Sequence, residues 1–297
     1  MSDRALTAAR SDLLVLLAGL ILAIVPAEGR TQESVRLALG GSPGEWLRYS
    51  HRNDLVVDLP TDLGGPATTR TTILLHHRID TVSGDAIGYA TTLEEISLDV
   101  RPTPDELPDL SGIQGLEFYH TATLAGRTTS LRLSGQTTEA GPGLLEQVEA
   151  WLSQLGFPPL PDGTATVGDV WSETTPVPAA ALGLAVDYDV VRTRKMRLAE
   201  VKSAGNSTVA FLAVTTTWVP APDPSGTGGS VASLRGTAEQ TVRFDVKRGR
   251  FLGSTGTSEL ELVLTPEGAA QYVAVNASGR QITRLTASSD TDPGYRE

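Results

Sequence analysis

The chain has 297 residues, contains no cysteine and carries a formal net charge of −11 at neutral pH. The acidic balance argues against general nucleic-acid binding and against adhesion to anionic lipid surfaces, because both require cationic side chains. The lack of cysteine excludes thiol nucleophiles, thiolate metal sites and a lipidated lipobox cysteine, so an apolar core has to stabilise the fold without disulfides.

The N-terminal region predicts export. An apolar run at residues 13–25 follows a short segment with two arginines, and residues 25–27 are Val-Pro-Ala. A run of this length suits the hydrophobic region of a signal peptide and is short for a membrane span. We therefore expect residues 1–27 to be a signal peptide that is cleaved near Ala27, giving a periplasmic or extracellular protein without an integral membrane span. Retention of the segment as an uncleaved anchor is the alternative.

Alternation of apolar and polar residues predicts many antiparallel strands that have one face covered and the other in water. Threonine residues, often in pairs or triplets, favour the same pleated structure. Residues 83–85, 204–206 and 247–250 each contain a glycine of the kind that hairpin turns require. The segments with the clearest alternation are 73–79, 96–100, 131–133, 242–246 and 260–264.

One segment is patterned as a helix. Leu145, Val148, Leu152 and Leu155 are spaced by three, four and three residues, which places them on one helical face. Gly156 and the proline that follows it shortly afterwards are typical of a helix end. An amphipathic helix must bury its apolar face, and the apolar face of a sheet is the available partner.

The predicted fold is therefore mainly β. We expect one large curled antiparallel sheet, a half-barrel of about ten strands, packed on this central amphipathic helix. This domain would cover residues 28–286, with a disordered tail at residues 287–297. Two tandem β-sandwiches joined near residue 160 are the competing architecture.

A Pro-rich stretch after the predicted helix leads into residues 167–171, Val-Gly-Asp-Val-Trp. This Val-Gly-Asp-x-Trp motif, together with Phe251 and Gly253, resembles that of an exported bacterial family of unknown function. The layout of strands and helix is similar to the half-barrels of periplasmic lipoprotein carriers and mycobacterial lipid-binding lipoproteins, although the lipobox cysteine of the latter is missing. The resemblance implies a concave face that could hold lipid. In a structural interpretation Asp169 forms a tight turn and Trp171 anchors a strand; in the alternative, both line a ligand mouth.

The sequence carries no pattern for catalysis or for a metal. His76 and His77 are neighbours on a predicted strand, so they point to opposite faces and cannot easily share one ion. We expect His77, on the apolar face, to be a hydrogen-bonded core residue. No Gly-x-Ser-x-Gly or Ser-x-x-Lys motif is present, and carboxylates two residues apart are typical of a solvated strand face. We predict no catalytic residue, no cofactor and no metal site.

A cationic segment at residues 192–197, Arg-Thr-Arg-Lys-Met-Arg, stands out in this acidic chain. The plain interpretation is an exposed strand whose charges discourage edge-to-edge pairing. In the functional interpretation Arg192 and Arg194 lie at the rim of a cavity and meet an acidic group of a ligand. Lys195 and Arg197 would then share the opposite face of the strand. The predicted ligand-binding residues are Tyr188, Arg192, Arg194, Met196 and Trp171.

Two functions remain open at this stage. The first is an exported, non-catalytic binding protein that holds a lipid, an acyl chain or a lipoprotein on the concave face of its sheet. The second is a structural or protein-interaction module of the cell envelope, with a filled core and no ligand.

Overall fold

The computed structural model describes residues 34–61, 65–103, 110–134, 157–178, 189–220, 231–264 and 273–289. The chain divides into two compact units, residues 1–34 and 35–297, and the strands below form the second, with β1 beginning at the boundary. The predicted signal peptide lies outside the described residues. Within those residues, no helix is long and apolar enough to cross a membrane.

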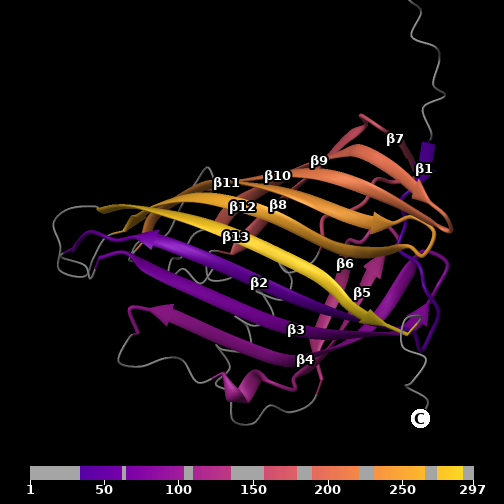
Figure 1. Ribbon diagram of the computed structural model, residues 1–297, viewed down its shortest axis with the longest axis horizontal. Coiled ribbons are helices and arrows are strands. Elements are labelled where there is room, and N and C mark those ends of the chain that lie inside the picture. The colour runs from indigo at the N-terminus through magenta and orange to yellow at the C-terminus, as the bar shows by residue number, and fades with distance from the viewer. Residues whose placement is uncertain are drawn as a thin grey trace, which may run out of the picture. The chain divides into compact units, whose positions relative to one another are not determined.

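The described part of the chain is built almost entirely of strands, most of them long. They are β1 (Ser34–Arg36), β2 (Trp46–Asp58), β3 (Ala67–Val82), β4 (Ala86–Arg101), β5 (Glu117–Thr123), β6 (Thr128–Leu133), β7 (Thr164–Thr166), β8 (Val170–Pro178), β9 (Asp189–Ala204), β10 (Ser207–Pro220), β11 (Val231–Asp245), β12 (Arg250–Leu264) and β13 (Val273–Ser288). Eleven of them form one antiparallel sheet in the order β6-β5-β4-β3-β2-β13-β12-β11-β10-β9-β8, and β1 pairs with β7 (Figure 1). The large sheet is open, with β6 and β8 as its edges.

In sequence order β2 is the first strand of the large sheet and β13 is the last. The two pair with each other in the middle of the sheet. The competing architecture of two tandem sandwiches is therefore wrong, since both halves of the chain contribute to a single sheet. The sheet is strongly curled: His51 on β2 and Arg194 on β9 line one cavity, although four strands separate β2 from β9.

The predicted packing of this sheet on a central amphipathic helix is wrong. The described residues contain no α-helix, and η2 (Ser111–Ile113) is a short 3-10 turn. The predicted stripe, residues 145–155, lies outside the described residues. Two extended segments supply buried apolar side chains instead, with Leu37 and Leu160 almost completely buried in the core around Phe244.

The two ends of the sheet differ in their connections. Short turns join the strands at one end, and the predicted turns at residues 83–85, 204–206 and 247–250 are confirmed. Gly249 has a φ of 62°, and a Cβ there would lie 2.4 Å from the backbone nitrogen of Gly40, so only glycine fits. At the opposite end the connections are longer, and they join strand ends at residues 58–67, 101–117, 178–189, 220–231 and 264–273.

The Val-Gly-Asp-x-Trp motif forms a turn and an anchor, as its structural interpretation expects. Gly168 has a φ of 103°, and the Asp169 carboxylate accepts a 2.8 Å hydrogen bond from the backbone N–H of Thr166. The indole N–H of Trp171 donates to the carbonyl oxygen of Pro159 at 2.8 Å. The motif therefore fixes the extended segment before it against the start of β8.

Candidate functional site: two adjoining cavities on the concave face

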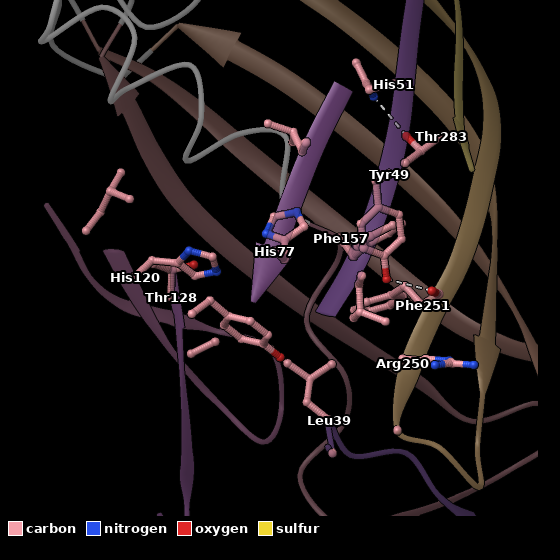
Figure 2. A pocket seen from close by; sticks show the side chains of 18 of the residues that line it. Leu39, Tyr49, His51, His77, His120, Thr128, Phe157, Arg250, Phe251 and Thr283 are labelled. Carbon is pink, nitrogen blue, oxygen red and sulfur yellow. Dashed lines mark hydrogen bonds between the residues drawn. The ribbon is translucent and has the colours of Figure 1, made fainter. Parts of the chain in front are cut away.

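An aromatic cavity of about 140 Å³ lies on the concave face near the short turns. Figure 2 shows its wall, in which Tyr49 and His77 face Phe157 and Phe251. The rings of Phe157 and Phe251 are stacked with their centroids 4.1 Å apart, and the Tyr49 ring meets the edge of Phe157 at 5.4 Å. Such a wall is apolar over most of its area, as binding sites for apolar groups are. We name this space the aromatic cavity.

Three polar side chains of the aromatic cavity wall form hydrogen bonds within the protein. The Tyr49 hydroxyl donates to the carbonyl oxygen of Phe251 at 2.8 Å, and burial raises its pKa above the usual range. His77 Nδ1 is 2.7 Å from the Thr91 hydroxyl, and His51 Nδ1 is 2.9 Å from the Thr283 hydroxyl (Figure 2). These hydrogen bonds orient the side chains, and Arg250 adds a cationic side chain to the same wall (Figure 2).

The histidines of this wall are neutral at neutral pH. Burial lowers the pKa of His77 to about 3, and those of His51 and His120 to about 4. The expected hydrogen bond of His77 is present, to Thr91, but the half-buried ring lines the cavity and is not part of the core. In the part of the chain that the structure describes, no group of three or more His, Asp or Glu residues is placed to hold a metal ion.

A second, larger cavity of about 370 Å³ adjoins the first, and its wall mixes polar and apolar side chains. His51, Phe157 and Thr283 belong to the walls of both cavities, so the two spaces meet at these residues. We name the second space the polar cavity. Its wall is drawn from β2 and from β9 to β13, on the side of the longer connections.

The register of the sheet arranges the polar cavity wall in transverse rows, since directly opposed residues on antiparallel strands share a face. One row contains Arg192, Trp218, Gly236, Leu260 and Ala277. The next contains Arg194, Thr216, Ala238, Ser258, Gly279 and Leu55. Farther along these rows the small residues Ala277, Ala238 and Ser258 line the cavity.

Arg192 and Arg194 bring two positive charges into this wall without an ion pair. Burial lowers the pKa of Arg194 to about 10. The neighbouring positive charge of Arg192 lowers this pKa further, whereas the negative charge of Glu173 raises it. Burial likewise lowers the pKa of Arg192. Neither arginine forms a salt bridge with a carboxylate of the described residues. An unpaired guanidinium in a buried wall is costly, and an anion is the group that would compensate it.

Two hydrogen-bond donors beside these charges lack a partner. The Nε atom of Arg192 and the indole nitrogen of Trp218 are both buried, and neither has a hydrogen-bond partner among the described residues. Arg192 and Trp218 are directly opposed on β9 and β10. Because buried donors are nearly always satisfied in folded proteins, this pair marks the place where an acceptor is missing.

The structure brings two of the five predicted ligand-binding residues together in the cavity wall, Arg192 and Arg194. Met196 is completely buried in the core, and Trp171 packs on the same core cluster. Tyr188 lies outside the described residues. The plain interpretation of the cationic segment is wrong, because β9 is paired on both sides, with β8 and β10, and is not an edge.

Sequence reasoning missed several wall residues, among them Trp218 and the carboxamides of Asn53, Gln240 and Gln281. Strand alternation puts each of these side chains on a definite face of its own strand. It gives no sign that strands from opposite ends of the chain meet around one space.

No protein-family model matches the chain, and no curated protein matches it. The resemblance of the Val-Gly-Asp-x-Trp motif to an exported bacterial family therefore stays a prediction. Among solved structures, the chain is similar to one described as "Lipid-protein interactions in lipovitellin", with 12% sequence identity and a TM-score of 0.47. The match covers 86% of this chain and 26% of that chain, so this chain spans about a quarter of its length. A likeness this distant has no bearing on function.

Proposed function

We propose that the protein is an exported, non-catalytic binding protein that holds an amphipathic acidic lipid on the concave face of its curled sheet. The acidic group lies in the polar cavity at Arg192 and Arg194. The apolar part extends into the aromatic cavity past Phe157, where the two spaces meet. Long-chain fatty acids and phospholipids are the ligand classes with this combination of groups.

The observation that carries the proposal is that Arg192 and Arg194 line the cavity without a salt bridge to any carboxylate of the described residues, although Glu173 lies opposite Arg194 on β8. Side chains that only stabilise a fold are paired when they are buried, and these two lack an ion-pair partner in the described part of the chain. They also line a cavity of about 370 Å³, large enough for an acidic group to enter. The cavity argues against the other function considered, a structural module with a filled core.

Further support comes from the division of the concave face into two chemical zones. Ligand sites combine mostly apolar walls with a few polar groups that orient the ligand. The aromatic cavity offers the first, and the arginine rows offer the second. Export is supported by the apolar run at residues 13–25.

Titration of the purified protein with a fluorescent long-chain fatty acid tests the proposal. We expect saturable binding with a Kd in the micromolar range or tighter. Replacing both arginines, Arg192→Gln and Arg194→Gln, should weaken binding at least tenfold, because the charge-assisted hydrogen bonds to the acidic group are lost.

The matched control is the pair Lys195→Gln and Arg197→Gln, which removes two charges from the exposed face of the same strand. This pair should leave the Kd unchanged, and circular dichroism should show both double variants folded. Absence of saturation, or equal affinity of the Arg192/Arg194 variant and the parent protein, would refute the proposal in favour of the structural module.

A further inference from the structure

A row of carboxamide side chains crosses the polar cavity beside the arginine rows. Gln240 on β11 is opposed to Gly256 on β12, which is opposed to Gln281 on β13, which in turn is opposed to Asn53 on β2. All four residues line the cavity. Glycine is needed at position 256, because a Cβ there would lie 2.6 Å from the carbonyl oxygen of Glu239.

The carboxamides differ in how far the protein itself satisfies them. Gln240 donates a 2.7 Å hydrogen bond to the Ser254 hydroxyl. Within the part of the chain that the structure describes, the side chains of Asn53 and Gln281 form no hydrogen bond. Each carboxamide both donates and accepts hydrogen bonds, so the groups that fit Asn53 and Gln281 are hydroxyls.

The carboxamides and the arginines lie too far apart to bind one small anion. The carboxamide row is the row of Met196, two residues along β9 from Arg194, which corresponds to a spacing of about 7 Å along the strand. Across the sheet, β9 and β13 are separated by β10, β11 and β12. A carboxylate held at Arg192 and Arg194 would leave Asn53 and Gln281 unoccupied. The ligand group that meets both sets extends across the cavity.

We propose that the polar cavity binds a phosphate ester that carries free hydroxyl groups, such as the glycerol phosphate head of an acidic lipid. The phosphate oxygens accept hydrogen bonds from Arg192, Arg194 and the indole N–H of Trp218. The hydroxyl groups bind the carboxamides of Asn53 and Gln281. This inference rests on the proposed function, and it selects hydroxylated phospholipids from the acidic lipids that the proposed function allows.

Two lipids with the same acyl chains and the same charge provide the test. Phosphatidylglycerol has free hydroxyls on its head group, whereas phosphatidylethanol is the corresponding phosphodiester without them. Isothermal titration of the parent protein should show phosphatidylglycerol binding about tenfold tighter, as expected for two additional hydrogen bonds. Oleate should bind no tighter than phosphatidylethanol.

Two variants test whether Gln281 causes the preference for phosphatidylglycerol over phosphatidylethanol. Gln281→Ala should reduce the ratio of the two affinities to about twofold or less while leaving the Kd for phosphatidylethanol within a factor of about two. Asn276→Ala removes an exposed carboxamide from the other face of the same strand and should keep the full ratio. Circular dichroism and thermal unfolding would show that both variants are folded.

The outcomes separate this inference from the proposed function. Equal binding of phosphatidylglycerol, phosphatidylethanol and oleate, or an unchanged ratio in Gln281→Ala, would overturn the hydroxyl site and leave the acidic-lipid proposal intact. Absence of binding by all three lipids would overturn both. Free glycerol 1-phosphate is the last probe: binding as tight as that of phosphatidylglycerol would assign the site to a soluble ester and refute the lipid source.

Discussion

Replacing Arg194 by methionine should make the protein more stable while it loses ligand affinity. At neutral pH the guanidinium is charged in both the folded and the unfolded chain, and burial lowers its pKa from 12.5 to about 10 in the folded state. This shift corresponds to an electrostatic penalty of about 3 kcal/mol in the folded protein, which applies in full at any pH below 10. Methionine keeps an unbranched apolar stem and removes the charge.

The expected gain in the free energy of unfolding is therefore up to about 3 kcal/mol. For a domain of this size such a gain raises Tm by roughly 6–12 °C. Thermal unfolding followed by circular dichroism measures it, in the absence of lipid and in its presence. Saturating lipid should raise Tm of the parent protein and have a much smaller effect on Arg194→Met, because a ligand stabilises only the state that binds it.

Arg197→Met is the control, because Arg197 is exposed on the other face of β9. Its effect should stay within about 0.5 kcal/mol, as for most surface substitutions. A lower Tm for Arg194→Met than for the parent protein would refute the reasoning. It would mean that Arg194 stabilises the fold through a counter-charge within the protein and is not held ready for a ligand.

The remaining predictions concern the walls of the aromatic cavity. The free energy of unfolding should fall as the pH drops from about 6.5 toward 4. In this range His51 takes up a proton in the unfolded chain but stays neutral in the folded chain, where its pKa is about 4. In His51→Gln the slope of the unfolding free energy against pH, measured by urea titration, should be smaller by up to about 1.4 kcal/mol per pH unit; an identical slope would contradict a neutral His51. Phe251→Ala should lower the free energy of unfolding by about 3–5 kcal/mol, because Phe251 is stacked on Phe157 at 4.1 Å and meets the edge of Phe244 at 5.1 Å. A loss below about 1 kcal/mol in the same urea assay would show that these contacts contribute little.

The failure of the predicted central helix has a definite cause. A spacing of three and four apolar residues indicates which face of a helix would be buried if a helix forms. The prediction then reasoned that such a helix must bury its apolar face against the sheet. In the structure Leu37 and Leu160, on extended segments, pack into the core with Phe244.

The sequence by itself determined the strands, the turns and the direction of individual side chains. Alternation placed Arg192 and Arg194 on one face of β9 and Lys195 and Arg197 on the other, because the two-residue period of a strand is a local property of the backbone. The exposed fractions of these side chains agree with that assignment.

Only the tertiary structure decided what those side chains face. Trp218 opposes Arg192 through the register of two neighbouring strands, and Gln281 and Asn53 come from strands near opposite ends of the chain. His51 and Thr283, which hydrogen-bond where the two cavities meet, are 232 residues apart in sequence. Such pairings depend on the register and curl of the whole sheet. No local period encodes these properties, because they arise from the packing of all the strands at once.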